Sequence, residues 1–271
     1  MRFLAIERQQ GIALVSVLAV VAVMAMIATG LIQKRSVEIV RTQSIESARV
    51  ASSLLQGVES HLLKALSAQR DRQDLYEGDG CRSPRHSITL DSATIEVQLE
   101  NLHCRFNINA MGTSAKANAL FVGLVDRLTL EGMVEGIDGR VLSASIAGWK
   151  DGTRIAPYRS ASGRTQLNAG QRFRSVSELA LLPETSGDEW RQLARYLTAL
   201  PTAEHGVDVS TAPSVLKSAI RDTEANGYDG NVRFVQADLS VLVGERIFHS
   251  CAVMDLEASS IFLREQLPCL R

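Results

Sequence analysis

The sequence begins with MRFLAIERQQG, residues 1–11, which is followed directly by IALVSVLAVVAVMAMIATGLI, residues 12–32. The first stretch is short and polar, whereas the second contains no charged residue. At a rise of about 1.5 Å per residue, a helix of this length spans roughly 30 Å, the thickness of the hydrocarbon core of a bilayer. We therefore predict that residues 12–32 form a membrane-spanning helix and that residues 1–11 are a leader peptide.

The order of these parts differs from that of a secretory signal peptide, in which the cleavage site follows the apolar region. Here the plausible processing residue, Gly11, precedes the apolar region. Cleavage after Gly11 would leave Ile12 as the new N-terminus and would keep the apolar helix in the mature protein. This arrangement is typical of type IV pilins and pseudopilins, and the start of the chain resembles theirs. The leader alone leaves an uncleaved single-pass anchor open as the alternative.

The overall charge argues against a nucleic-acid partner. The 271 residues carry a formal net charge of −1, whereas nucleic-acid binding usually needs a basic patch. The leader is net positive and is expected to stay in the cytoplasm, so the chain beyond Ile32 would lie across the membrane. Lys34 and Arg35 weaken this charge rule, because they place two positive charges on the far side.

The chain has four cysteines, and in an oxidising compartment an even number favours disulfide bonds. The chain has no C-x-x-C spacing, which argues against a zinc ribbon or a thioredoxin-like site. We favour the pairs Cys81–Cys104 and Cys251–Cys269, because each closes a short loop. The sequence leaves the other connectivities open, as well as free buried thiols.

The helical pattern continues beyond the apolar stretch. Apolar residues recur mostly at spacings of three and four, and after residue 33 neither proline nor glycine occurs before Gly57. They are Val37, Val40, Ala48, Ala51, Leu55, Val58, Leu62 and Leu66. We therefore predict one helix from about residue 12 to about residue 67, half in lipid and half in water.

Strand patterns lie on both sides of a helical block. Residues 87–90 and 94–99 alternate apolar and polar residues about Asp91–Ser92, which predicts a β-hairpin, and the second strand is expected to resume through residues 104–108. Helices are predicted at residues 115–130, 141–149, 176–182, 189–200 and 213–223. Thr211 is placed to cap the last of these helices. Strand patterns return from Asn231 to the end of the chain, in three segments.

This order predicts an α+β fold in which a long N-terminal helix packs on a small antiparallel sheet and a large all-α domain is inserted between strands. We assign residues 12–32 to the membrane half of the helix. The pilin-like α/β domain comprises residues 33–109 and 229–271, and the inserted helical domain comprises residues 110–228.

Several segments, in this order, resemble the type II secretion system minor pseudopilin K family. They are QQGIALVSVLAVVAVMA (residues 9–25), RFNIN (105–109), SVSELALLP (175–183), YLTALP (196–201) and VDVSTAPSVLKSAI (207–220). No single segment is a strong motif, but the order is that of the family and covers nearly the whole chain.

The resemblance implies a non-enzymatic minor pseudopilin at the tip of a pseudopilus, which primes assembly for export of folded proteins across the outer membrane. It implies cleavage between Gly11 and Ile12 by a prepilin peptidase, with N-methylation of Ile12. The implied partners are minor pseudopilins I and J, together with H, the major pseudopilin G and inner-membrane lipid. The implied location is the inner membrane, with a single span and the C-terminal domain in the periplasm.

Ser16 departs from the usual pseudopilin pattern, which has a glutamate at the fifth residue after the processing glycine. In a bundle of apolar helices an unpaired N-terminal ammonium is costly, and the glutamate of the next subunit neutralises it. A subunit with no neighbour above it has no ammonium to neutralise, so Ser16 indicates a tip position. The alternative is a tolerated small polar residue that bonds to the helix backbone.

The resemblance also raises the question of calcium, which some members bind through acid-rich loops of the insertion. The corresponding region here is AGWKDGTRIAPYRSASGRTQ, residues 147–166, in which Asp151 is the only acid. Calcium takes six to eight oxygen ligands, several of them carboxylates. We therefore predict no metal and no other cofactor.

The sequence disfavours two other classes of function, a DNA-binding protein and an enzyme. Residues 207–220 resemble the segment that leads into DNA-binding helix-hairpin-helix modules, but LLPETSG, residues 181–187, lacks the paired glycines that approach phosphates there. An anchored periplasmic enzyme is the other alternative. The chain contains no H-E-x-x-H, G-x-S-x-G, P-loop or dinucleotide fingerprint, and its five histidines are scattered. Both classes are therefore disfavoured.

Overall fold

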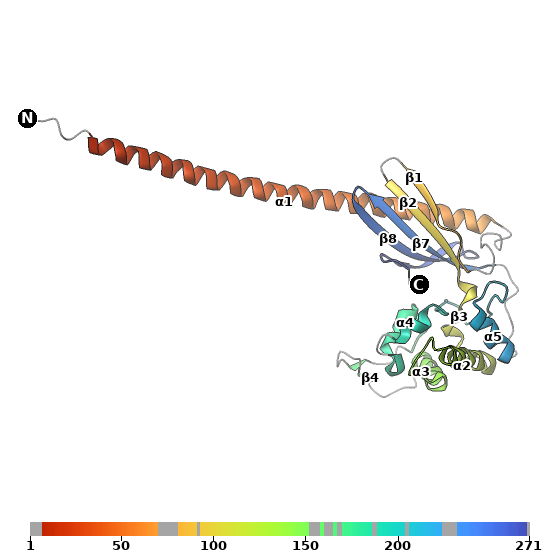
Figure 1. Ribbon diagram of the computed structural model, residues 1–271. Coiled ribbons are helices and arrows are strands. Elements are labelled where there is room, and N and C mark those ends of the chain that lie inside the picture. The colour runs from red at the N-terminus through yellow and green to blue at the C-terminus, as the bar shows by residue number, and fades with distance from the viewer. Residues whose placement is uncertain are drawn as a thin grey trace, which may run out of the picture. The chain divides into compact units, whose positions relative to one another are not determined.

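The computed structural model describes residues 7–69, 81–90, 93–151, 158–159, 165–166, 170–185, 189–203, 206–223 and 232–269. The chain divides into two compact units, residues 1–52 and residues 53–271. Figure 1 shows the helices and strands of both units with the labels used below.

Helix α1 runs without a break from Glu7 to Ala68, which confirms the single long helix predicted from the apolar stripe. It begins four residues before Gly11, inside the expected leader. Side chains from Val15 to Arg35 are exposed, whereas Leu55, Glu59 and Leu66 in the second unit are buried. The two halves of the helix therefore have different surroundings, as the change in their sequence patterns predicts.

A five-stranded antiparallel sheet, in the order β1-β2-β7-β8-β9, forms the centre of the second unit (Figure 1). Its strands are β1 (His86–Leu90), β2 (Ala93–Asn101), β7 (Phe234–Val243), β8 (Arg246–Asp255) and β9 (Ser260–Glu265). The predicted hairpin is confirmed, because Leu90 pairs with Ala93 across the expected turn. Alternate residues of β2, such as Ile95 and Val97, are buried, as a sheet with one covered face requires.

The chain leaves the sheet after β2 and returns with β7, which is the neighbour of β2. Residues 102–233, here called the insertion, therefore lie between two adjacent strands. The described part of the insertion contains four α-helices, α2 (Ala115–Leu130), α3 (Gly139–Asp151), α4 (Glu189–Ala194) and α5 (Ser214–Thr223). Helix α2 packs against both α3 and α5 (Figure 1). This arrangement confirms the predicted fold class.

Shorter elements complete the insertion. They are the 3-10 turns η2 (Leu102–Cys104), η3 (Ile108–Ala110), η4 (Val176–Leu181) and η5 (Pro183–Thr185), and the two-residue strands β3 (Phe106–Asn107), β4 (Tyr158–Arg159), β5 (Thr165–Gln166) and β6 (Leu197–Thr198). Strand β3 pairs with β6 in parallel, and β4 pairs with β5.

Three local predictions were wrong. Residues 176–181 form the 3-10 turn η4 rather than an α-helix, and the helix predicted to reach residue 200 ends at Ala194. The strand expected through residues 104–108 is interrupted by η2 and is reduced to β3. The reason is packing, because Phe106 is fully buried against Phe121 of α2, with ring centroids 5.6 Å apart, instead of extending the sheet.

The same packing moves the start of the insertion. Phe106 and Ile108 belong to the hydrophobic core of the helical layer, together with residues of α2, α3, α4 and α5. The expected boundary between residues 109 and 110 therefore lies inside the insertion, which begins directly after Asn101. The other expected boundary, at residues 228–229, lies outside the described residues.

Candidate functional site

Residues 15–32 of α1 present an uncharged apolar surface. Gly11 and Ile12 lie within the helix, and Ser16 is exposed on it. The side chains of Val15, Leu18 and Met26 are between 61% and 74% exposed. Each large apolar side chain gains about 1.5–3 kcal/mol when it is removed from water, so this surface requires lipid or other apolar helices around it. Among the described residues, α1 is the one helix long and apolar enough to cross a membrane.

The second half of α1 carries a buried carboxylate, that of Glu59. Its side chain accepts a hydrogen bond of 2.6 Å from Ser250 Oγ on β8 and one of 2.7 Å from Arg264 Nε on β9. Both oxygens are engaged, which is the condition for burying a charge without a large loss of stability. Glu59 was not among the predicted site residues, although its place four positions after Leu55 puts an acid on the apolar face of the helix.

A buried polar cluster, here called the root cluster, holds the insertion to the sheet. It consists of Asn101, His103, Asp208 and Thr211, all less than 9% exposed. The carboxylate oxygen Oδ2 of Asp208 accepts hydrogen bonds from Asn101 Nδ2 at 3.1 Å and from Thr211 Oγ1 at 2.7 Å. The backbone N–H of Asp208 donates to His103 O at 2.8 Å. The end of β2 and residues 208–211 are therefore joined by side chains and by backbone.

His103 in the root cluster also binds the strand that returns to the sheet. Its Nε2 accepts hydrogen bonds from the backbone N–H groups of Arg233 and Phe234, at 3.3 and 3.4 Å. Burial lowers the pKa of His103 to about 4, although Asp208 opposes the shift. The imidazole is therefore neutral at pH 7, and Nε2 is a hydrogen-bond acceptor for the start of β7.

The two asparagines of the RFNIN segment join parts of the insertion that are far apart in sequence. Asn109 Nδ2 donates to Phe173 O and Leu200 O, both at 2.8 Å, and its Oδ1 accepts from Phe173 N at 2.9 Å. Asn107 Nδ2 donates to Thr202 O at 2.9 Å, and its Oδ1 accepts from Leu200 N at 3.1 Å. The polar residues of this segment are therefore structural, and they occupy buried positions where each amide is satisfied.

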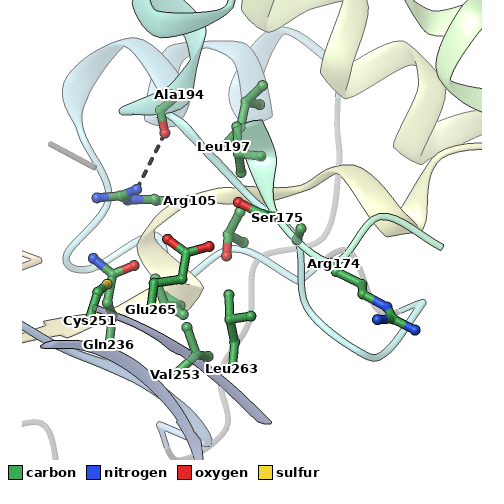
Figure 2. A pocket seen from close by; sticks show the side chains of 14 residues that line it. Arg105, Arg174, Ser175, Ala194, Leu197, Gln236, Cys251, Val253, Leu263 and Glu265 are labelled. Carbon is green, nitrogen blue, oxygen red and sulfur yellow. Dashed lines mark hydrogen bonds between the residues drawn. The ribbon is translucent and has the colours of Figure 1, made fainter. Parts of the chain in front are cut away.

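A small pocket lies between the sheet and the insertion (Figure 2). Its volume is about 50 Å³, and its lining includes Val253 and Leu263 of the sheet and Leu197 of the insertion. Arg105, also in the lining, donates through Nη1 to Ala194 O at 3.3 Å (Figure 2). It also forms an ion pair with Glu100. The pocket has room for water molecules but is far smaller than the clefts that hold small-molecule ligands.

The four cysteines lie in two separate pairs. Cys251 on β8 and Cys269 form a disulfide bond, which is one of the two bonds predicted. Cys81 and Cys104 are thiols in the structure, so the other predicted bond is not formed there. Both thiols contact Thr211 of the root cluster: Cys81 Sγ lies 3.3 Å from its backbone oxygen, and Cys104 Sγ lies 3.0 Å from its hydroxyl.

In the part of the chain that the structure describes, no group of three or more His, Cys, Asp or Glu side chains could hold a metal ion. Asp151 lies exposed at the end of α3, and residues 152–157 lie outside the described residues. The neighbouring Lys150 places its ammonium on two backbone oxygens, with Nζ 2.7 Å from Asn109 O and also bonded to Met111 O. The absence of calcium stays a prediction.

Thr211 does not cap α5 as predicted. Its hydroxyl donates to Asp208, and α5 begins three residues later, at Ser214. Ser175, by contrast, accepts a hydrogen bond from Ser177 N at the start of η4, as an N-cap does.

Comparisons with known proteins agree with this architecture. Residues 104–202 match the family model described as type II secretion system (T2SS), protein K. The chain is 26% identical over 225 residues to type II secretion system protein K of Pectobacterium carotovorum subsp. carotovorum, over 76% of this chain and 67% of that protein. It also resembles a chain in the crystal structure of the GspK-GspI-GspJ complex of the type 2 secretion system of enterotoxigenic Escherichia coli. That match has a TM-score of 0.66 and 17% sequence identity, and covers 84% of this chain and all of the other.

An apolar N-terminal helix that continues onto an antiparallel sheet defines a pilin-like, membrane-anchored protein. Within this class, the insertion between β2 and β7 includes the region that matches type II secretion system protein K. The chain is similar to type II secretion system protein K in sequence and in fold, and this similarity supports a minor pseudopilin of type II secretion. The comparisons support neither the DNA-binding nor the enzymatic alternative.

Proposed function

We propose that this chain is the tip subunit of the pseudopilus and that it primes assembly of the filament. The observation that carries the proposal is the uncharged exposed helix with Ser16 at the fifth position after Gly11. A carboxylate at this position neutralises the N-terminal ammonium of the subunit above, so its absence fits a subunit that has none above it. The insertion gives the chain additional bulk, which would obstruct an internal position in a helical lattice.

Processing comes before assembly in this proposal. A prepilin peptidase cuts between Gly11 and Ile12 and methylates the new amine of Ile12. The net positive leader stays in the cytoplasm, and the sheet and the insertion lie in the periplasm. The apolar helix holds the subunit in the inner membrane until assembly, when it exchanges lipid for neighbouring helices that are equally apolar.

The partners follow from the chemistry of this surface. Exposed aliphatic side chains along α1 fit the apolar N-terminal helices of other pseudopilins. The solved complex that this chain resembles contains GspK, GspI and GspJ. We propose that this chain assembles with minor pseudopilins I and J of its own system, and then with H and the major pseudopilin G.

Replacement of Gly11 by valine tests the proposal, because a bulky residue before the scissile bond should block the peptidase. We expect Gly11→Val to leave a full-length membrane precursor and to abolish secretion in a strain that lacks the wild-type chain. Gly57→Val is the matched control, because Gly57 lies outside the apolar segment and a Cβ there would meet no heavy atom of the chain within 4 Å. N-terminal sequencing and mass measurement of the membrane-isolated proteins report the cleavage. Normal processing and secretion by Gly11→Val would refute the proposed function.

The tip position needs a measurement of its own. A photoreactive residue placed in α1 should cross-link this chain to pseudopilins I and J. Any cross-links to the major pseudopilin should come only from subunits below this chain in the filament. Cross-links to the major pseudopilin both above and below this chain would place it inside the filament and refute the tip assignment.

A further inference from the structure

The backbone brings Cys81 and Cys104 to the same place. Residues 81–83 run antiparallel to the end of β2, with Asn101 N donating to Cys81 O at 2.8 Å and Ser83 N donating to Leu99 O at 2.8 Å. Cys104 follows Asn101 by three residues and ends the 3-10 turn η2. Nothing in this arrangement depends on the thiols themselves, because the contacts are backbone hydrogen bonds.

The two sulfur atoms then meet at one residue, Thr211. The hydroxyl hydrogen of Thr211 is donated to Asp208, so the contact of 3.0 Å between Cys104 Sγ and Thr211 Oγ1 is a thiol donating to the hydroxyl oxygen. The thiol of Cys81 donates to the backbone oxygen of the same residue at 3.3 Å. The neighbouring side chain of Cys81, together with burial, raises the pKa of Cys104.

We propose that Cys81 and Cys104 form a second disulfide bond in the mature protein, which ties the segment that enters the sheet to the base of the insertion. The bond encloses the whole β1–β2 hairpin and ends beside the root cluster. It rests on the proposed periplasmic location, because that compartment favours disulfides. The other disulfide, Cys251–Cys269, joins strand β8 to the C-terminal segment.

The bond forms by thiol–disulfide exchange with an oxidant that carries a disulfide. The thiolate of Cys81, the less buried of the two, attacks the oxidant disulfide, and one oxidant thiolate leaves. The thiolate of Cys104 then attacks the Cys81 sulfur, and the second oxidant thiolate leaves. The two cysteines lose two protons and two electrons in total, and the oxidant disulfide is reduced to a dithiol. Since Cys104 is fully buried in the folded chain, we expect this step to accompany folding.

The test uses the full-length protein isolated from membranes. Cells are quenched with acid, the protein is denatured in the presence of N-ethylmaleimide without reductant, and its peptides are identified by mass spectrometry. We expect none of the four cysteines to be alkylated, and a peptide containing Cys81 to be linked to one containing Cys104. After reduction, all four should react.

Other outcomes distinguish a failure of this inference from a failure of the proposed periplasmic location. Alkylation of both Cys81 and Cys104 while Cys251 and Cys269 remain linked would overturn this inference and leave the proposed function intact. A cross-pairing such as Cys81 with Cys251 would also overturn it. Alkylation of all four cysteines would overturn the inference together with the periplasmic location on which it rests.

A variant provides a second measurement. Cys104→Ser keeps a hydroxyl that can donate to Thr211 and leaves Cys81 unpaired. We expect Cys81 to become reactive and the thermal midpoint of the full chain in detergent to fall by about 5–10 °C, because the constraint on the unfolded chain is lost. A midpoint equal to that of the wild type, combined with an equally reactive Cys81 in the wild type, would contradict the bond.

Discussion

Glu59 and Arg264 form an ion pair that joins α1 to the edge strand β9, with Arg264 Nε 2.7 Å from Glu59 Oε2. The carboxylate is buried, with 1% of its side chain exposed, whereas 43% of the arginine side chain is exposed. The pair is therefore asymmetric, because the arginine can be solvated when it is left alone and the glutamate cannot. Ser250 donates to the other oxygen of Glu59, so the helix contacts two adjacent strands through one side chain.

We predict that Arg264→Met destabilises the chain more than Glu59→Gln does. Removal of the arginine leaves the buried charge of Glu59 with one hydroxyl partner. We expect this to lower the free energy of unfolding by about 3 kcal/mol. Glu59→Gln leaves an arginine that water can reach, so we expect the free energy of unfolding to fall by only about 1–2 kcal/mol. Urea unfolding of the full chain in detergent measures both. Glu46→Gln, at an exposed position of the same helix, is the control, for which we expect less than about 0.5 kcal/mol. Equal losses for all three variants would contradict the asymmetry.

The depressed pKa of His103 predicts how the stability of the chain depends on pH. Burial lowers this pKa from the usual value of 6.5 to about 4, so the unfolded chain binds a proton that the folded chain does not bind between these two values. Stability is therefore full above pH 6.5, falls as the pH decreases towards 4, and loses roughly 3 kcal/mol over this range. The range from pH 5 to 7 isolates the histidine from most carboxylates.

We expect His103→Gln to flatten the pH dependence between pH 5 and 7, measured from urea unfolding at several pH values. The variant is less stable at pH 7, because Arg233 N and Phe234 N lose their acceptor. His86→Gln, at an exposed position of β1, is the control and should retain the slope. The explanation fails if the slope of the wild type persists in His103→Gln.

The sequence predicted those elements whose causes are local. Helix α2 spans the expected residues, because apolar positions recur at helical spacing and Ser114 accepts a hydrogen bond from Ala117 N at its start. The β1–β2 hairpin follows from alternation about a two-residue turn. Both patterns are complete within a few residues, so they can be recognised without knowledge of the rest of the fold.

The elements that were missed depend on distant partners. Strand β3 exists because Phe106 pairs with Leu197, ninety-one residues later, and Phe106 is buried by α2 rather than by the sheet. The sequence places Thr211 where a helix cap is expected, but its hydroxyl donates to Asp208 and both thiols contact it instead. The pairing of acids with bases, such as Glu59 with Arg264, likewise has no sequence pattern at a separation of about two hundred residues.

Ser16 gives a prediction about assembly. In the tip position, a carboxylate at residue 16 would have no ammonium above it, and an uncompensated acid in an apolar bundle costs about 2–3 kcal/mol. We therefore expect Ser16→Glu to lower the initiation of pseudopili by roughly 30- to 150-fold. Ser16→Ala, which adds no charge, should retain initiation. Counts of assembled pseudopili and the rate of secretion measure both variants. An increase in incorporation with Ser16→Glu would indicate an internal subunit instead.

Asn109 gives the last prediction, which concerns the insertion alone. Its side chain satisfies the backbone N–H and C=O of Phe173 and the C=O of Leu200, and it is fully buried. Asn109→Ala leaves these three groups without this partner, and a buried unsatisfied group costs about 1–3 kcal/mol, so we expect a total loss of about 2–4 kcal/mol after partial repair by water.

The loss should appear first within the insertion. We expect limited proteolysis to cut Asn109→Ala in residues 102–233 while the sheet and its Cys251–Cys269 disulfide remain intact. Lys116→Ala, at an exposed position of α2, is the control and should resist proteolysis as the wild type does. Since the proposed tip role depends on a folded insertion, secretion should decrease in Asn109→Ala and not in Lys116→Ala. Wild-type resistance to proteolysis in Asn109→Ala would show that the asparagine does not hold these segments together.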